Sequence, residues 1–435
     1  MEKRIINTYE EAVSYLFDVP KFTTKHTMED TKAFLHKLGN PDKNMKIIHV
    51  AGTNGKGSVC TYLASMLKSA GFTCNVFTSP HLEDVRERFL TNGKMIEKDT
   101  FFKAFMTVYE GLSWEELESG AGYHPSFFEY LFFMAMLIFT EHKADYCILE
   151  TGLGGRLDAT NAVSNKEISV ITHMGIDHTE YLGNTLADIA KEKAGIMKEN
   201  TPVVFWNTAK ESTEVFTEWA NMLQIPCFSV SKQDYRLLKN SNKSIDFSYS
   251  SIYYDSVRLC ARTIAEYQME NISLAARAFE VLLGERPDGR SEMEQGVAAA
   301  FWPGRMEEIL PDIFVDGAHN EDGIRAFLET VSQDGITSKR ALVFGVVQDK
   351  AYNDMIEKIV SAKLFDKVAV VQMQSARALS VEHILEQFAQ FGFTKVESFS
   401  SVDEMLGGLD EFKEGCGRVY VAGSLYLVGE IKAKV

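Results

Sequence analysis

A glycine-rich segment between an apolar run and a helical pattern constrains the fold of this chain most strongly. Residues 46–50 read KIIHV, residues 52–57 read GTNGKG, and a helical pattern begins at Ser58. A strand, a glycine-rich turn and a helix start in this order form a cradle for phosphate, because backbone N–H groups and the helix N-terminus point toward the anion. Lys56 can reach the outer phosphates, and the Ser58 hydroxyl can ligate Mg²⁺. The segment therefore predicts ATP binding.

The loop differs from the common pattern GxxxxGK[ST] in two ways. Two residues rather than four separate the first two glycines, and Gly57 stands between Lys56 and Ser58. The alternative interpretation is a glycine turn with a solvated lysine, but the order of strand, loop and helix favours a phosphate cradle. The residues expected to contact the nucleotide here are Gly52, Thr53, Asn54, Gly55, Lys56, Gly57 and Ser58.

Apolar runs alternate with helical patterns along most of the chain, which is typical of an α/β protein with a largely parallel sheet. With 435 residues, the chain exceeds the size at which one core keeps growing. We therefore expect a nucleotide-binding domain over residues 1–303 and a smaller, Rossmann-like α/β domain over residues 304–435. Short alternating runs at 234–257 predict antiparallel hairpins at an edge of the first sheet. The expected strands are 46–50, 73–77, 146–149, 169–172 and 202–205, then 313–315, 341–344, 368–371 and 419–421.

Charge and composition limit the classes of partner. The formal net charge of −16 disfavours nonspecific binding to nucleic acid or to an anionic membrane, but allows a small anion in a local basic pocket. Six scattered cysteines and an N-terminus without an apolar signal region predict a cytoplasmic protein. The most apolar stretch, residues 127–140, is too short to span a bilayer and suits a buried helix.

Polar groups follow two further predicted strands. Glu150 ends one strand and precedes the glycine-rich segment TGLGGRLDATN, while His178 follows the strand at 169–172. Because ligands of open α/β sheets lie at the carboxyl ends of the strands, Glu150 could face a metal held by Ser58. By itself, His178 could equally be an ordinary loop residue. Lys193 lies in a helical pattern, where lysines are usually solvated.

Taken together, eight segments resemble the folylpolyglutamate synthase and dihydrofolate synthase family, relatives of the Mur ligases. They read HVAGTNGKGSV, TSPHL with a following RER, ETGLGGRLDATN, IDHTEYLGNT, EKAGIMK, the arginine of PGR, DGAHN and GSLYLVGE. The segments extend from His49 to Glu430, so the resemblance covers nearly the whole chain. The glycine at position 57 is itself a feature of this family. The resemblance implies a Mur-ligase-like P-loop domain followed by a C-terminal glutamate-ligase domain.

The resemblance also implies roles that spacing alone does not assign. Ser58 and Glu150 would hold one Mg²⁺, Glu150 and His178 would hold a second, and Lys193 would be carbamylated into an anionic metal ligand. In the second domain, five residues would face the nucleotide or the glutamate: Arg305 at the γ-phosphate, Asp316 and His319 at the nucleotide and the glutamate, and Ser424 with Tyr426 at the glutamate. One helix residue of the first domain, Asn271, would contact adenine. His319 is also the candidate for the general base.

Two segments depart from the family pattern. The segment HPSFFEY, which ends at Tyr130, has proline and serine where a threonine often stands. The segment VVQDKAY keeps Asp349 and Lys350 but lacks a following aspartate. These departures concern the pterin side of the site more than the chemistry.

The expected activity is an ATP-dependent amide ligation that adds L-glutamate to a folate, to dihydropteroate or to both through an acyl phosphate. Lys56, Arg305 and His319 would carry the chemistry, and we expect a monomer without nucleic-acid or membrane partners. One alternative is a Mur-type ligase acting on a cell-wall precursor, although only about 45 residues precede the loop. Another is a nucleotide-binding switch, which would need neither a Glu150–His178 pair nor a DGAHN motif.

Overall fold

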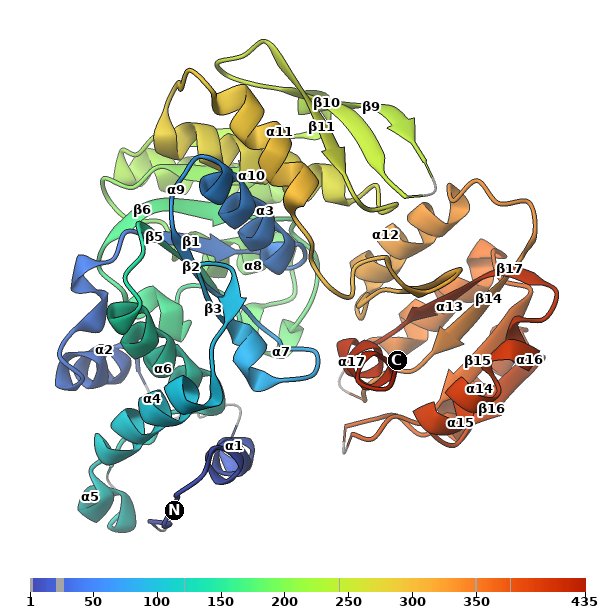
Figure 1. Ribbon diagram of the computed structural model, residues 1–435, viewed down its shortest axis with the longest axis horizontal. Helices are drawn as coiled ribbons and strands as arrows, with labels where there is room; N and C mark the ends of the chain where they lie inside the picture. Colours follow the sequence, from blue (N-terminus) through green and yellow to red (C-terminus); the bar gives the residue numbers. More distant parts are fainter. Residues whose placement is uncertain (1–2, 21–26, 121, 242, 349, 376) are drawn as a thin grey trace.

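The computed structural model describes residues 3–20, 27–120, 122–241, 243–348, 350–375 and 377–435 (Figure 1). Asp349, one of the two residues kept in VVQDKAY, lies outside these ranges. Figure 1 shows two α/β units side by side, the first built by the N-terminal two thirds of the chain and the second by the rest. Among the described residues, no helix has the length and apolarity needed to cross a membrane.

The larger sheet has the strand order β4-β3-β2-β5-β1-β6-β7-β8 within the described ranges. The strands from β2 to β8 in this order run parallel, while β3 is antiparallel to β2 and β4 to β3. All five residues of β1 are buried, as expected for a central strand covered on both faces. The bounds are β1 Ile47–Ala51, β2 Cys74–Phe77, β3 Phe89–Thr91, β4 Lys94–Met95, β5 Tyr146–Glu150, β6 Lys166–Ile171, β7 Val203–Trp206 and β8 Cys227–Val230.

Helices cover both faces of this sheet. Successive side chains of a strand point to opposite faces, so the apolar strands need a core on each side. Ile47 joins an aromatic-rich core on one face, and Ile48 joins a second core on the other. The first core is formed with α1 (Tyr9–Asp18), α2 (Met28–Lys37), α4 (Lys98–Glu110) and α6 (Phe127–Glu141), and the second with α3 (Lys56–Ser69), α10 (Gln268–Leu283) and α11 (Gly289–Ala299). The remaining helices of this unit are α5 (Trp114–Glu118), α7 (Thr179–Leu182), α8 (Leu186–Ala194) and α9 (Lys210–Leu223).

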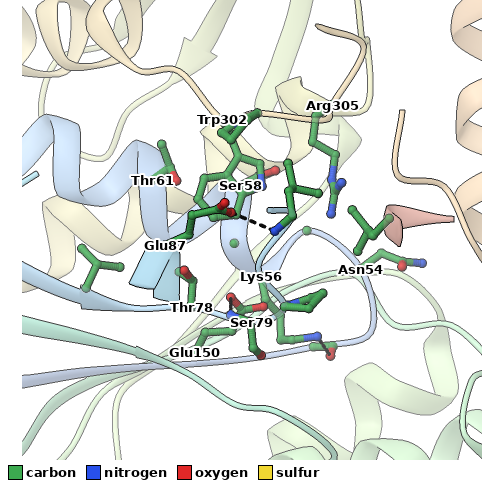
Figure 2. A pocket seen from close by; sticks show the side chains of 18 of the residues that line it. Asn54, Lys56, Ser58, Thr61, Thr78, Ser79, Glu87, Glu150, Trp302 and Arg305 are labelled. Atoms are coloured by element: carbon green, nitrogen blue, oxygen red, sulfur yellow. Dashed lines mark hydrogen bonds between the residues drawn. The ribbon is translucent and has the colours of Figure 1, made fainter. Parts of the chain in front are cut away.

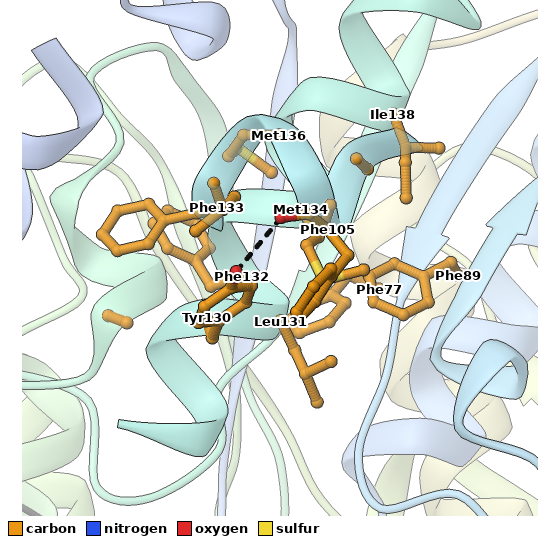
Figure 3. Packing of buried hydrophobic residues seen from close by; sticks show 14 of the residues in the cluster. Phe77, Phe89, Phe105, Tyr130, Leu131, Phe132, Phe133, Met134, Met136 and Ile138 are labelled. Atoms are coloured by element: carbon orange, nitrogen blue, oxygen red, sulfur yellow. Dashed lines mark hydrogen bonds between the residues drawn. The ribbon is translucent and has the colours of Figure 1, made fainter. Parts of the chain in front are cut away.

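The apolar stretch at 127–140 is the buried helix α6, as predicted. Its aromatic side chains interlock with those of neighbouring elements (Figure 3). Tyr130 stacks on Phe105 with ring centroids 5.2 Å apart, and its hydroxyl donates to the Phe105 carbonyl at 3.1 Å. The buried hydroxyl therefore has a hydrogen-bond partner. Helix α6 packs on one face of the sheet, and α3, the helix that follows the phosphate loop, packs on the other.

The antiparallel prediction for residues 234–257 is confirmed, but the predicted position at a sheet edge is wrong. The strands β9 (Tyr235–Asn240), β10 (Ile245–Ser250) and β11 (Ser256–Ala261) form a separate antiparallel sheet. Its apolar face, with Phe247 and Leu259, packs into the same core as α3, α10 and α11. Alternation along a strand shows that one face is buried, but it does not show which sheet the strand joins.

The second unit is a mostly parallel sheet with the order β12-β13-β17-β14-β15-β16 in the part of the chain that the structure describes. Only the β12–β13 pair is antiparallel. Strand bounds are β12 Glu307–Leu310, β13 Ile313–Val315, β14 Lys339–Phe344, β15 Lys367–Val371, β16 Val396–Phe399 and β17 Cys416–Ala422. One core includes α12 (Glu321–Ser332), α13 (Tyr352–Ala362) and α14 (Val381–Gln390), and the other includes α15 (Val402–Gly407), α16 (Leu409–Lys413) and α17 (Leu425–Lys432).

The chain passes from the first unit to the second through residues 300–306, between α11 and β12. The predicted α/β class, with a large and mainly parallel sheet followed by a smaller C-terminal α/β unit, is confirmed. The division at residue 303 remains a proposal about independent domains. This connection brings Trp302 and Arg305 to the carboxyl end of β1, where the phosphate loop begins.

Candidate active site

The phosphate loop joins β1 to α3 in the predicted order of strand, loop and helix. Gly52 and Gly55 have φ angles of +153° and +87°, which residues with a side chain rarely adopt. A Cβ atom at Gly55 would lie 2.1 Å from Asn271 Oδ1. The first turn of α3 has no side-chain cap and no acidic residue. The N–H groups of this turn and the positive end of the helix dipole therefore face the cavity in front of the loop.

Two lysines converge on the loop. Lys56 Nζ donates to the carbonyls of Gly52 and Thr53, each at 3.2 Å, and Lys193 Nζ donates to the same Gly52 carbonyl at 2.8 Å. Lys193 is buried on α8, so it is not the solvated helix residue that its spacing suggests. Burial, followed by the charge of Lys56, lowers the pKa of Lys193 to about 7.

Glu150 and Ser58 line the same cavity, and both are labelled in Figure 2. Both are 2% exposed; Glu150 Oε2 accepts the Ser79 N–H at 3.0 Å, and Ser58 Oγ accepts from Gln268 Nε2 at 3.2 Å. Burial raises the pKa of Glu150 to about 6, although Lys56 and the Ser79 N–H lower it. A cation at this carboxylate would offset the cost of burying its charge.

His178 precedes α7 and lines the same cavity. Its φ angle is +52°, and its Nε2 lies 3.9 Å from Asp177 Oδ1. Burial lowers the pKa of His178, so the neutral ring that a metal needs is favoured. Within the described ranges, no group of three or more His, Cys, Asp or Glu side chains could hold a metal ion. A metal site at Glu150 and His178 would therefore need further ligands, such as Ser58 or a modified Lys193.

The second unit contributes Arg305 and His319 to the cavity. Arg305 Nη1 donates to the Gly304 carbonyl at 2.9 Å, and His319 Nδ1 lies 2.7 Å from the Gly317 carbonyl. Because that carbonyl can only accept, Nδ1 carries the proton and Nε2 is left as an acceptor. Burial, followed by the charge of Lys350, lowers the pKa of His319 to about 4. The ring is neutral at pH 7 and a weak base.

Asp316 and Asn271 lie behind the cavity wall and do not line it. Asp316 accepts hydrogen bonds from the Tyr267 hydroxyl at 2.6 Å and from the N–H groups of Met306 and Ala318 at 3.0 and 2.8 Å. Asn271 Nδ2 donates to Gln268 Oε1 at 3.0 Å, while its Oδ1 packs on the loop. In this structure, both residues support the cavity, and their direct contacts with a ligand remain predictions.

The cavity has a volume of about 590 Å³ and is lined by residues of both units. This is within the usual range for a small-molecule site. It brings together most of the residues that the sequence predicted: all seven loop residues 52–58, Glu150, His178, Lys193, Arg305, His319, Ser424 and Tyr426. Ser424 is the N-cap of α17, and its Oγ accepts the Tyr426 N–H at 3.1 Å. Arg377 Nη1 donates to the Tyr426 hydroxyl at 3.2 Å.

Comparison with known proteins places this geometry in a family. Sequence models of the Mur ligase middle domain and of the Mur ligase glutamate ligase domain match residues 50–279 and 304–425. The dihydrofolate synthase/folylpolyglutamate synthase of Bacillus subtilis is 31% identical over 441 residues, which cover 99% of this chain and 100% of that protein. The chain belongs to the folylpolyglutamate synthase and dihydrofolate synthase family. The predicted resemblance is thereby confirmed.

Two further relatives show how far this family likeness extends. The folylpolyglutamate synthase of Lacticaseibacillus casei is 31% identical over 365 residues, covering 81% of this chain and 83% of that protein. The Mycobacterium tuberculosis folylpolyglutamate synthase, solved with ADP and AMPPCP, superimposes with a TM-score of 0.88 at 26% identity. That comparison covers 98% of this chain and 97% of the other. The folate-ligase fold therefore includes both units of the present structure.

The cavity of this family member fits ATP with Mg²⁺. The uncapped start of α3 and the glycines of the loop suit phosphate, and the oxygen donors of Ser58 and Glu150 suit Mg²⁺. A glycine is favoured at position 57 for a different reason, because a Cβ atom there would lie 2.5 Å from Trp302 Cζ2. The glycine that distinguishes this loop thus leaves room for the indole of the inter-domain connection (Figure 2).

Four residues that the sequence did not single out also line or support this cavity. Gln268 links Ser58 to Asn271, and Trp302 packs on Gly57. Asp177 and Asn320 join the domains, as Asn320 Nδ2 lies 3.0 Å from both Asn54 Oδ1 and Asp177 Oδ2. The i, i+3 spacing of Gln268 and Asn271 was a usable signal. Nothing in the sequence pairs Asp177 with a residue of the second domain.

Proposed function

We propose that this chain is an ATP-dependent ligase that forms an amide between L-glutamate and the carboxylate of a folate. Its acceptors would be tetrahydrofolate and dihydropteroate, since the full-length relative from Bacillus subtilis bears both activities in its name. The observation that carries the proposal is one cavity in which the phosphate loop faces Arg305, His319 and Ser424 of the second domain. A Mur-type ligase would also contain the two matched domain families. The relatives described above that match nearly the whole chain, however, are named as folate ligases and not as Mur ligases.

Amide formation from a carboxylate needs activation, because the carboxylate oxygen is a poor leaving group. The folate carboxylate would attack the γ-phosphate of ATP, forming an acyl phosphate and releasing ADP. The glutamate amine would then attack the acyl carbon, and phosphate would leave from the tetrahedral intermediate. Lys56 and Arg305 would neutralise the charge that develops in the phosphoryl transfer, where positioning and electrostatics carry most of the catalysis.

Mg²⁺ would be held by Ser58, Glu150 and His178, in two sites that share Glu150. Bound there, it would neutralise phosphate oxygens and orient them. We also propose that Lys193 is carbamylated, since a carbamate would turn a buried cation beside Lys56 into an anionic metal ligand. The burial of Lys193 and its lowered pKa support this, because only an unprotonated amine reacts with CO₂.

The second domain would hold the incoming glutamate. His319 presents an unprotonated Nε2 to the cavity, which suits it to accept a hydrogen bond from the glutamate amine. With a pKa near 4, it would orient that amine better than it would remove a proton from it. Ser424 and Tyr426, at the start of α17, would line the side of the glutamate.

The acyl phosphate must be kept from water, and the contacts between the domains support a closed site. The Asn54–Asn320–Asp177 hydrogen bonds and the Asp177–Lys350 ion pair join the phosphate loop to the second domain. Closure around the substrates would exclude water and protect the intermediate. The proposal includes a monomeric cytoplasmic enzyme without nucleic-acid partners, in keeping with the net charge of −16.

A ligation assay tests this function. The chain is incubated with ATP, Mg²⁺ and L-glutamate, and is offered dihydropteroate, tetrahydrofolate or a cell-wall precursor. We expect phosphate release and a new amide with the two pteridine acceptors, and neither product with Lys56→Ala. Turnover with the cell-wall precursor alone would overturn the folate assignment, and ligation by Lys56→Ala would overturn the role of the loop.

A further inference from the structure

The cavity continues past the phosphate loop along α3, and the proposed chemistry does not use this part. We name it the α3 arm; Figure 2 shows where it begins, at Thr61 on the same helix as Ser58. Its walls are one face of α3, the strands β2 to β4 and the end of α11: Thr61, Ala64, Ser65 and Lys68, then Val76, Leu90, Asn92 and Met95, then Ala299 and Ala300. The arm is continuous with the space in front of the loop, so one elongated ligand can occupy both.

The helix presents a polar row to the arm. Thr61, Ser65 and Lys68 follow Gly57 at intervals of four, four and three residues, which places them on one side of an α-helix. This side is only partly covered by the core, whereas Tyr62, Leu63 and Met66 are buried. From Ser58 to Lys68 the helix rises about 15 Å. The row therefore extends well beyond the triphosphate.

The opposite wall of the arm is apolar, with Val76, Leu90 and Met95. Ser65 Oγ donates its proton to the Gly296 carbonyl at 2.6 Å, so it faces the arm as an acceptor. An extended chain with methylene groups on one side and amide N–H groups on the other matches these two walls. A single flat apolar ring would leave the polar row without partners.

Charge points to an anionic occupant. The described part of the cavity wall includes three acidic and six basic residues; of the basic ones, Lys68 lies in the α3 arm, while the other five lie at the phosphate loop or in the second unit. None of the acidic residues belongs to the α3 arm: Glu150 and Asp177 lie at the phosphate loop, and Glu87 accepts the N–H groups of residues 82–84. Lys68 stands in the last turn of α3 at the end of the arm, and no described residue forms an ion pair with it.

We propose that the α3 arm binds the γ-glutamyl chain of a polyglutamylated folate, with Lys68 pairing with the α-carboxylate of a glutamate added earlier. This inference rests on the proposed ligase function. The carboxylate that reacts must lie at the γ-phosphate, so the chain behind it must leave the loop through a continuous part of the cavity. A γ-glutamyl chain offers one carboxylate per residue to Lys68, methylene groups to Leu90 and Met95, and amide N–H groups to Ser65.

The test compares acceptors that differ only in chain length. Values of kcat/KM are measured for tetrahydropteroyl mono-, di- and triglutamate with the unmodified chain, Lys68→Gln, Lys68→Arg and the control Lys37→Gln. Lys37 is also exposed in the last turn of a helix but lies outside the cavity. We expect Lys68→Gln to lower kcat/KM about three- to fivefold for the longer acceptors, through KM, and to leave the monoglutamate within twofold.

Charge-preserving and salt controls sharpen the result. Lys68→Arg should retain most of the preference for the longer acceptors, Lys37→Gln should match the unmodified chain, and added salt should weaken the preference. An equal loss for all three acceptors, no loss for any, or rejection of the diglutamate by the unmodified chain would overturn the inference while the ligase function stands. Failure of the unmodified chain to ligate any acceptor would instead refute the proposed function.

Discussion

Asp177 Oδ1 and Lys350 Nζ form an ion pair 3.1 Å apart across the two domains. Both side chains are largely buried, at 15% and 9% exposed. Although burial raises it, Lys350, His178 and Asn320 hold the pKa of the Asp177 carboxyl well below its usual range. Asn320 also reaches Asn54, so the phosphate loop and the second domain share one hydrogen-bonded cluster.

If this pair holds the domains in the closed arrangement, its two residues should act as a unit. We expect Asp177→Asn and Lys350→Met each to lower kcat/KM for ligation, and the double variant to lose less than the sum of the two. A double-mutant cycle of kcat/KM should give a coupling energy of about 1–2 kcal/mol, the size found for residues in direct contact. Additive losses would show that the ion pair does not contribute to closure.

The contact between Gly57 and Trp302 makes a second prediction. A methyl group at position 57 would meet the indole ring at 2.5 Å, so either the ring or the first turn of α3 must move. We expect Gly57→Ala to raise KM for ATP by at least about fivefold, which corresponds to ~1 kcal/mol of overpacking.

A second substitution separates crowding from other effects of the alanine. Trp302→Leu added to Gly57→Ala removes the ring atoms that the methyl group meets, and should recover part of the ATP affinity. Steady-state kinetics with varied ATP measure both variants. Normal KM for Gly57→Ala alone would contradict a role for this contact.

Carbamylation of Lys193 has its own test. Lys193→Ala should lower ligation by roughly 10²-fold or more, as expected when a preorganised charge is removed from a phosphoryl-transfer site. Added formate or acetate should restore part of the rate, because a small carboxylate can occupy the space of the carbamate. Lys193→Arg keeps the positive charge but cannot be carbamylated. Near-normal ligation by this arginine variant would exclude the modification as a requirement.

A buried histidine links stability to pH. His49 is completely buried in β1; its Nε2 bonds Thr160 Oγ1 at 2.8 Å, and its Nδ1 has no partner among the described residues. Burial, followed by the charge of Lys166, lowers the pKa of His49 well below its usual range. The ring stays neutral in the folded chain, while the unfolded chain takes up a proton below about pH 6.5.

The unfolded state therefore binds more protons than the folded state below about pH 6.5, and stability is lost as the pH falls. The loss from His49 should approach ~1.4 kcal/mol per pH unit well below pH 6.5. We expect His49→Gln to make the decline in unfolding free energy between pH 6 and 5 shallower by about that amount, measured by urea unfolding. The exposed His36→Gln is the matched control. An unchanged pH dependence in His49→Gln would show that another group causes the decline.

Much of the fold followed from sequence because periodicity and turn residues are local signals. The strand, loop and helix around Gly52 and the buried helix α6 both formed as predicted. The sheet of β9 to β11 was misplaced because its alternation shows a buried face without showing what covers it. The position of Glu150 in the cavity could be predicted from sequence, because ligands of open α/β sheets bind at the carboxyl ends of the parallel strands.

The remaining parts of the site depend on contacts between distant segments. Lys193 resembles a solvated helix lysine until α8 is packed against the loop, 141 residues away in sequence. Asp177 and Lys350 are 173 residues apart and meet only when the domains dock. Asp316 follows a strand as a ligand-binding aspartate would, yet its oxygens are used by Tyr267, Met306 and Ala318. Spacing identifies positions, but it does not show which polar groups the protein satisfies internally.

The most direct test of the central claim follows an oxygen atom from the folate to phosphate. Tetrahydrofolate labelled with ¹⁸O in its γ-carboxylate is incubated with the chain, ATP, Mg²⁺ and L-glutamate, and the released phosphate is analysed by mass spectrometry. Ligation through an acyl phosphate predicts one ¹⁸O atom in the phosphate for each amide formed, because the carboxylate oxygen leaves with the phosphoryl group. Unlabelled phosphate, or phosphate release without amide formation, would contradict the account.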